Sequence, residues 1–183
     1  QCLLAPHRNQ PMTKDDIEQR LKDTLRAEQV VWLDHGNLVG DDTDGHIDTI
    51  VRTAPENTLL YVGCDDSHDE QYEDFLALEH QLMSLRTSTG MPYRLLRLPM
   101  PDAIYDEGER LPATYANFLI INGAVICPTY AQPEKDKQAL QTIAQAYPDR
   151  EIIGIDARTV IKQHGALHCL TMQFPQGVIA NNP

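Results

Sequence analysis

Three helical segments recur at similar intervals along the chain, each set among short runs of strand-forming residues. The helices are predicted to begin near residues 13, 69 and 133, and the recurring order is strand, strand, helix, strand. Such self-similarity is typical of architectures in which one supersecondary unit is repeated and packs against its neighbours. The first unit lacks its opening strand, and residues 165–175 read as the opening strand of a further unit. The sequence therefore predicts an α/β array that begins and ends within a unit, as a cut ring or a fragment of a longer protein would.

Local signals define the ends of these helices. Thr13 is a suitable N-cap with Asp16 three residues later, Pro133 suits a first helical position, and Pro148 ends the third helix. A turn containing Gly123 separates two apolar runs and predicts a hairpin. Alternating or continuous apolar residues predict strands at residues 2–6, 30–33, 46–54, 58–63, 93–99, 118–122, 124–129, 151–156 and 165–175.

Composition restricts the possible partners. The 183 residues suffice for one domain with a sizeable core, and the net charge of −12 disfavours nucleic acid and anionic membranes as partners. No apolar stretch is long enough to span a bilayer or to form a secretory signal. The four cysteines contain no Cys-x-x-Cys pair, and reduced thiols are expected. These features together predict a cytoplasmic protein whose negative charge suits a small cationic ligand.

The stretch GDDTDGHID, residues 40–48, concentrates acidic side chains around one histidine. If the segment is extended, Asp42, Asp44, His46 and Asp48 all point to the same face, because alternate residues of a strand share a face. An acidic turn capped by His46 is an equally consistent interpretation. A calcium loop lacks its closing glutamate here, and the zinc deaminase signature is absent. The spacing alone leaves a binding wall and a solvated turn open.

Cys169 lies in HGALHCLTMQFP, where Gly165 permits close approach of the backbone before the predicted strand. In that strand Cys169 shares a face with Thr171 and Gln173. A buried cysteine that packs as a small apolar residue is the common alternative. As a thiolate, Cys169 would be a nucleophile stabilised by a cationic substrate, with His46 moving the protons. No partner pattern singles out the remaining histidines, His7, His35, His68, His80, His164 and His168.

Three stretches of this sequence, VVWLDHGNLVGDDTDGHIDTIVR, YANFLIINGAVICPTY and EIIGIDARTVIKQHGALHCLTMQFP, resemble the agmatine deiminase and bacterial-type peptidylarginine deiminase family of the guanidine-modifying pentein superfamily. The resemblance implies a partial fivefold α/β propeller built of ββαβ modules. Members of the family are about twice this length, so it also implies that residues 1–183 are the C-terminal portion of a single propeller domain. The missing N-terminal half would add further carboxylates that grip the guanidinium.

The resemblance further implies the chemistry. Cys169 attacks the guanidinium carbon, His46 protonates the departing ammonia and then activates water, and Asp48 hydrogen-bonds the guanidinium. Asp44 is placed beside the substrate on the assumption that it shares the strand face, where it would orient or polarise His46. No metal and no organic cofactor is required. A departure occurs before the His-Cys pair, where Gln-His-Gly-Ala replaces the Gly-Gly-Gly-Asn that the family often carries.

The function implied is hydrolysis of agmatine to N-carbamoylputrescine and ammonia, as in polyamine metabolism. A deiminase of free or peptidyl arginine is the alternative within the same chemistry. A truncated module that binds guanidinium compounds without turning them over is the alternative of another class. The expected partners are a small guanidinium substrate, the missing half of the protein and further copies of the same chain.

Overall fold

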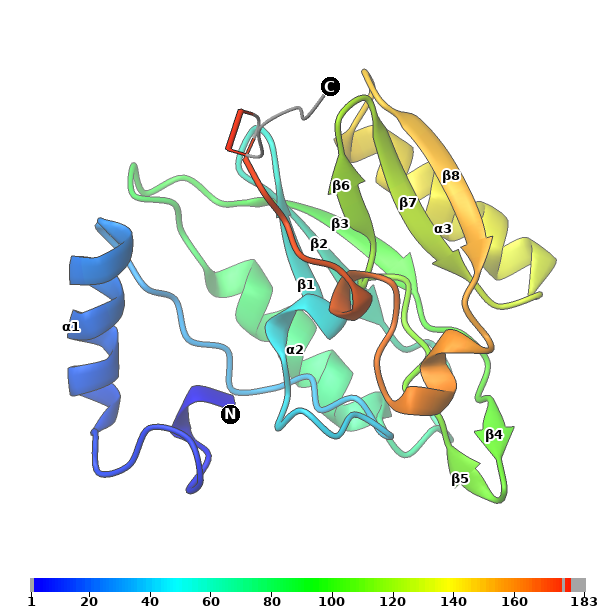
Figure 1. The fold of residues 1–183 in the computed structure, drawn as a ribbon, viewed down its shortest axis with the longest axis horizontal. Coiled ribbons are helices and arrows are strands. Elements are labelled where there is room, and N and C mark those ends of the chain that lie inside the picture. Colours follow the sequence, from blue (N-terminus) through cyan, green and yellow to red (C-terminus); the bar gives the residue numbers. More distant parts are fainter. Residues whose placement is uncertain (1, 176, 179–183) are drawn as a thin grey trace.

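The computed structural model describes residues 2–175 and 177–178, and its fold is α/β. Two units of the same design lie side by side (Figure 1). In the first unit, β1 (Val51–Ala54) pairs antiparallel with β2 (Thr58–Gly63). The chain then crosses through α2 (Tyr72–Ser84) and returns as β3 (Arg94–Pro99), which pairs parallel with β2. This arrangement confirms the strand, strand, helix, strand order predicted from the sequence.

The second unit repeats that topology. Strands β6 (Leu119–Ile121) and β7 (Ala124–Thr129) form an antiparallel hairpin that turns at Gly123, whose φ of +78° suits glycine. Helix α3 (Pro133–Ala146) begins at its proline and leads to β8 (Glu151–Asp156), which pairs parallel with β7. The order of strands is therefore β6-β7-β8, matching β1-β2-β3 in the first unit.

Helix α1 (Lys14–Leu25) has the predicted start but no sheet of its own among the described residues. The Thr13 hydroxyl accepts a hydrogen bond from the Asp16 backbone, and the Asp16 carboxylate accepts one in return from the Thr13 backbone, which completes a capping box. Of its apolar stripe only Ile17 is buried, and Leu25 is exposed. Residues 30–33 are extended but form no strand.

The strand predictions for residues 2–6, 30–33 and 165–175 are wrong, and the prediction for 46–54 is confirmed only for residues 51–54. Residues 2–4 form a 3-10 helix instead of part of a strand. The predicted strand 46–54 divides into the 3-10 helix η2 (Ile47–Thr49) and β1. The C-terminal segment 165–175 contains the 3-10 helix η4 (His168–Leu170) and no strand. Residues 30–33 lack a strand because no neighbour within the described chain supplies ladder hydrogen bonds, without which an extended segment is not a sheet strand.

A short hairpin and a buried connection join the two units. The hairpin consists of β4 (Tyr105–Asp106) and β5 (Glu109–Arg110), which the sequence did not predict. Residues 111–118 follow it, and all of them are buried although they form no helix or strand. This connection contacts η2 through a hydrogen bond from the Thr114 hydroxyl to the Thr49 carbonyl, and it leads into the start of β6.

The core consists of apolar side chains from both sheets and from the inner faces of α2 and α3. Strand β2, predicted from the run TLLYVG, is buried along its whole length, as is typical of continuous apolar strands. In the described part of the chain, no helix is long and apolar enough to cross a membrane. The largest fully buried side chains are Tyr115, Tyr130, Phe75, Phe118, Leu60, Leu78, Leu82, Leu98, Ile143, Ile161, Val62 and Val125.

Candidate active site

Three segments far apart in the sequence meet at η4. The Cys169 thiol lies 3.5 Å from Oδ1 of Asn117 and 3.9 Å from Oδ2 of Asp48. Asp48 belongs to η2, which precedes β1 of the first unit, and Asn117 lies two residues before the start of β6 in the second unit. Figure 1 shows the η4 region in front of the space between the two units. The thiol, the carboxylate and the amide therefore converge where the two units adjoin.

Asn117 is the central residue of this cluster. Its side chain is fully buried, and its Nδ2 donates to Oδ2 of Asp48 at 2.9 Å and to the Asp48 carbonyl at 3.3 Å. Its Oδ1 accepts from the backbone N–H of His168 at 2.9 Å and of Cys169 at 3.4 Å. One amide thus uses both ends to fix the carboxylate and the segment that carries the thiol relative to each other.

A partly buried arginine supports the backbone around Asn117. Arg52 donates through Nη1 to the carbonyl of Ala116 at 3.1 Å and to that of Phe118 at 2.5 Å, and its guanidinium lies 4.5 Å from the centre of the Phe118 ring. Burial lowers the pKa of Arg52, while the charge of Asp48 acts in the opposite direction. Both carbonyls that flank Asn117 are therefore held by one positive side chain.

His46 lies at the start of η2 and is half-buried. Its carbonyl accepts from the Thr49 hydroxyl at 2.7 Å, and the Thr49 carbonyl accepts from the buried Thr114 hydroxyl at 2.6 Å. These bonds fix the backbone of η2 on the buried connection. Within the described residues, the imidazole of His46 makes no hydrogen bond to Asp48 or Cys169. The structure therefore brings Asp48 to Cys169 directly, whereas His46 is two residues away on the same short helical turn.

Asp44 occupies a different position from the one expected. The segment 41–48 is bent, because Asp44 (φ +63°) and Gly45 (φ +83°) both adopt left-handed backbone conformations. The expectation that alternate residues of an extended 41–49 segment share one face is therefore wrong. The Asp44 carboxylate contacts Arg8 at 3.1 Å and His7 at 2.9 Å, and the hydrogen bond from Arg8 chiefly lowers its pKa. Its predicted role beside the substrate stays a prediction.

Gly165 allows η4 to fold back closely. A Cβ at this position would lie 3.1 Å from Cβ of Cys169, which is tighter than almost all real contacts of this kind. His164 precedes it with a φ of +65°, and its Nδ1 lies 2.9 Å from the carbonyl of Gly40. His164, which belongs to the Gln-His-Gly-Ala stretch, thus connects the segment before η4 to the loop before η2.

The cysteines differ in accessibility. Burial raises the pKa of Cys127 to about 12 and also raises that of Cys64. Cys169 is exposed, and Cys2 has intermediate exposure. Because a nucleophile must reach its substrate, Cys169 is the thiol best placed for chemistry. Cys64 and Cys127 are buried packing residues.

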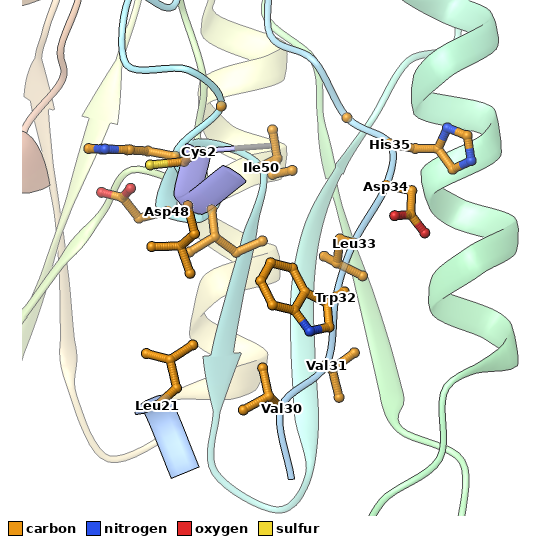
Figure 2. A pocket seen from close by; sticks show the side chains of 15 residues that line it. Cys2, Leu21, Val30, Val31, Trp32, Leu33, Asp34, His35, Asp48 and Ile50 are labelled. Atoms are coloured by element: carbon orange, nitrogen blue, oxygen red, sulfur yellow. The ribbon is translucent and has the colours of Figure 1, made fainter. Parts of the chain in front are cut away.

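A mostly apolar cavity of about 490 Å³ lies beside η2. Segment 30–36 forms one wall, Leu21 of α1 contributes to another, and His46 and Asp48 lie at its edge. Figure 2 shows Trp32 projecting toward the middle of this cavity, with Asp48 on the side away from Asp34 and His35. Cys169 is not one of its lining residues. The cavity therefore adjoins the cluster without enclosing the thiol.

Sequence reasoning missed Asn117 and His168. The imidazole of His168 lies 2.6 Å from the Asp48 carboxylate. Asn117 stands at the start of an apolar run and His168 beside a cysteine, and neither position carries a periodic or spacing signal. The one available hint for Asn117 was a polar residue at the start of the apolar run 118–121, which leads into β6.

Substitution Asn117→Asp is expected to destabilise the full-length protein by about 2 kcal/mol at neutral pH. The change keeps the acceptor for the two backbone N–H groups but places a second carboxylate against Asp48. Like charges at this distance raise the pKa of one carboxyl in the folded state, so the loss should shrink as the pH falls and that group is protonated. Urea unfolding at pH 7.5 and pH 5 measures both effects. The control is Asn122→Asp in the exposed β6-β7 turn, and equal stability of the two variants would contradict the assigned role of Asn117.

Comparison with known proteins agrees with this description. The family profile described as Porphyromonas-type peptidyl-arginine deiminase matches residues 1–175. A Marinomonas protein provisionally named agmatine deiminase is 35% identical over 193 aligned residues, which cover 96% of this chain and 52% of that protein. The chain thus spans about half the length of the relatives it matches.

Solved structures show the same relationship. A Porphyromonas gingivalis protein provisionally named arginine deiminase is 53% identical with a TM-score of 0.93, covering 96% of this chain and 52% of that one. Agmatine deiminase of C. jejuni, solved with substrate bound and one cysteine replaced by serine, is 40% identical with a TM-score of 0.85, covering 91% of this chain and 48% of that one. The chain belongs to the Porphyromonas-type peptidyl-arginine deiminase family.

Proposed function

We propose that this chain is the nucleophile-bearing portion of a guanidine deiminase that converts agmatine to N-carbamoylputrescine and ammonia. The observation that carries the proposal is the exposed Cys169 thiol held against the Asp48 carboxylate and the buried Asn117 amide. A carboxylate next to a thiolate is costly unless a cation joins them, because two negative groups repel each other. A planar guanidinium supplies that cation, with several N–H donors for the carboxylate.

The first step forms one bond and breaks another at the guanidinium carbon. The Cys169 thiolate attacks this carbon, and the C–N bond to one terminal nitrogen breaks. His46, as the imidazolium, gives that nitrogen the proton it needs to leave as ammonia. The product of this step is a covalent thiouronium-type adduct on the sulfur, with the positive charge retained on the substrate carbon and nitrogens.

The second step releases the product. Neutral His46 takes a proton from water, and the oxygen of that water adds to the same carbon. The C–S bond then breaks, the sulfur leaves as the thiolate, and the hydroxyl proton passes to solvent, where ammonia takes it up. The result is a ureido group and a regenerated enzyme. Asp48 keeps the guanidinium in register with the sulfur through both steps, and such positioning can supply much of the rate.

The fold supports the further proposal of a partial propeller. The two ββαβ units are equivalent in topology, and α1 followed by extended residues 30–33 has the form of the last two elements of such a unit. In the unit around α1, no strand precedes the helix among the described residues. The apolar cavity between α1 and residues 30–36 is where such strands would pack. We propose that residues 1–183 form the C-terminal portion of a fivefold α/β propeller whose other half supplies these strands.

The choice of agmatine over arginine is favoured by the names of several relatives. Proteins of Marinomonas, Photobacterium profundum and Vibrio parahaemolyticus at 34–35% identity are provisionally named agmatine deiminases. A solved structure at 53% identity, that of a Porphyromonas gingivalis protein, carries the name arginine deiminase instead. A free or peptidyl arginine substrate is therefore the second candidate, and it requires the same residues to act on the same guanidinium group.

A substrate panel on the full-length protein tests the proposal. Ammonia release should be fastest with agmatine and at least about tenfold slower in kcat/KM with arginine and with N-acetyl-arginine amide, since the site must reject their carbonyl groups. Faster turnover of either arginine compound would reassign the substrate and keep the chemistry. Tight agmatine binding without ammonia release would instead favour a guanidinium-binding module and overturn the enzymatic proposal.

Several expectations from the sequence stay predictions. They are the absence of a metal and of an organic cofactor, the cytoplasmic location, assembly with further copies of the chain, and the lack of nucleic-acid or membrane partners. Each is compatible with a net charge of −12 and with a reaction in which sulfur, imidazole and carboxylate perform every step.

A further inference from the structure

The two oxygens of the Asp48 carboxylate have different surroundings. Oδ2 accepts a hydrogen bond from Nδ2 of Asn117 at 2.9 Å, lies 2.6 Å from Nδ1 of His168, and is the oxygen 3.9 Å from the Cys169 thiol. Oδ1 has no hydrogen-bond partner among residues 2–175 and 177–178. Within the described part of the chain, protein groups thus occupy one oxygen of this carboxylate and do not bond to the other.

His168 is well held on the side of its backbone. Its N–H donates to Oδ1 of Asn117 at 2.9 Å, and the Thr171 hydroxyl donates to its carbonyl at 2.8 Å. Its imidazole is about one-third exposed and the Asp48 side chain about one-fifth exposed, with relative areas of 32% and 19%. A contact this short and this sheltered is a charge-assisted hydrogen bond rather than a loose surface pair.

The direction of the hydrogen bond follows from the chemistry of the partners. An ionised carboxylate only accepts, so Nδ1 of His168 must carry the hydrogen. The bond needs no second proton on the ring, because the neutral tautomer with hydrogen on Nδ1 suffices. A neutral ring also avoids placing a second cation beside the guanidinium that Asp48 is proposed to bind.

We infer that His168 is a positioning residue for the substrate-binding carboxylate: its Nδ1–H holds Oδ2 of Asp48 so that Oδ1 is presented to an N–H of the guanidinium. The inference rests on the proposed function, since it assigns Asp48 to the guanidinium. His168 directly precedes Cys169, so the same helical turn sets the nucleophile and the orientation of the carboxylate. The adjacent His-Cys pair thereby links the orientation of the carboxylate that binds the guanidinium to the position of the sulfur.

The test compares two replacements in the full-length Cys169→Ser protein, in which loss of the nucleophilic thiol is expected to allow substrate binding without rapid turnover. His168→Leu removes the donor and keeps a side chain of similar bulk. His168→Asn places an amide N–H close to where Nδ1 was. Calorimetric titration with agmatine, and with N-acetyl-arginine amide in parallel, gives the dissociation constant of each protein.

The Leu variant should bind about tenfold more weakly or worse, which is the usual effect of losing a hydrogen bond to a charged group. The Asn variant should recover most of that loss. His80→Leu on the exposed face of α2 is the matched control and should bind like the parent. A purely structural role would lower the fraction of active protein without changing the dissociation constant of the folded remainder.

Two results would overturn the inference alone. One is a Leu variant that binds as tightly as the parent, and the other is an Asn variant that is folded and as weak as the Leu variant. Failure of the proposed function has a separate signature, in which the parent binds neither guanidine and the wild-type protein releases no ammonia from either. In that case both proposals are abandoned.

Discussion

Replacement of Cys169 by alanine is expected to lower ammonia release by the full-length protein at least roughly 10³-fold. The thiol is the only group at the site that can form the covalent adduct, and water cannot substitute for it at the same carbon at a comparable rate. Initial rates with agmatine, measured by coupled detection of ammonia, give the effect. Binding of agmatine should survive, because Asp48 remains in place.

The control is Cys127→Ala, which removes a thiol that is fully buried in β7. That variant should keep nearly full kcat, with a loss confined to stability. Alkylation gives an independent readout, because iodoacetamide should modify exposed Cys169 far faster than Cys64 or Cys127, and agmatine should protect it. Retention of more than a tenth of the wild-type rate in the alanine variant would remove Cys169 from the mechanism.

Substitution Asp48→Asn is expected to reduce kcat/KM for agmatine roughly 100-fold, the usual scale for losing a charged hydrogen-bond partner. The asparagine keeps the size of the side chain and can still accept from Asn117 and His168. It cannot neutralise a guanidinium, so the cation is bound more weakly and less well aligned with the sulfur. Initial rates over a range of agmatine concentrations give KM and kcat separately, which report the weaker binding and the poorer alignment.

The matched control is Asp42→Asn, an exposed carboxylate of the same acidic loop. If long-range attraction by the net negative charge were the main effect, the two variants would lose activity alike. Added salt would then abolish the difference between each variant and the wild-type protein. A loss specific to Asp48 that persists at high salt supports direct contact with the guanidinium. A fully active Asp48→Asn variant would refute the assignment.

The regular elements of this fold were predictable because their causes are local. Continuous apolar residues in TLLYVG specify a buried strand, and Pro133 specifies the start of a helix. The Thr13 capping box depends on only four consecutive residues, 13–16. The candidate nucleophile, the imidazole and the carboxylate were likewise identified from the sequence, but through resemblance to a family rather than through spacing, which left the acidic turn and the binding wall equally possible.

Tertiary structure decided how the acidic loop is used. An extended segment would have aligned Asp44 with His46, but left-handed backbone at Asp44 and Gly45 turns the chain instead. Asp41 stabilises that turn by accepting from the backbone of Gly45 at 2.9 Å and from the Thr43 hydroxyl at 2.5 Å. Alternation of side chains holds only within a strand, so the pattern could not reveal that the acidic residues have separate partners.

The sequence by itself determined the residue types available for chemistry and the helices and strands that carry them, since both depend on neighbours a few positions apart. Only the tertiary structure decided which of these residues meet. Asp48 reaches Asn117 across 69 positions and His168 across 120, and no local preference encodes contacts at such separations. They arise because two sheets and a buried connection bury enough apolar surface to hold an amide, an imidazole and a thiol around one carboxylate, and that burial is a property of the whole fold.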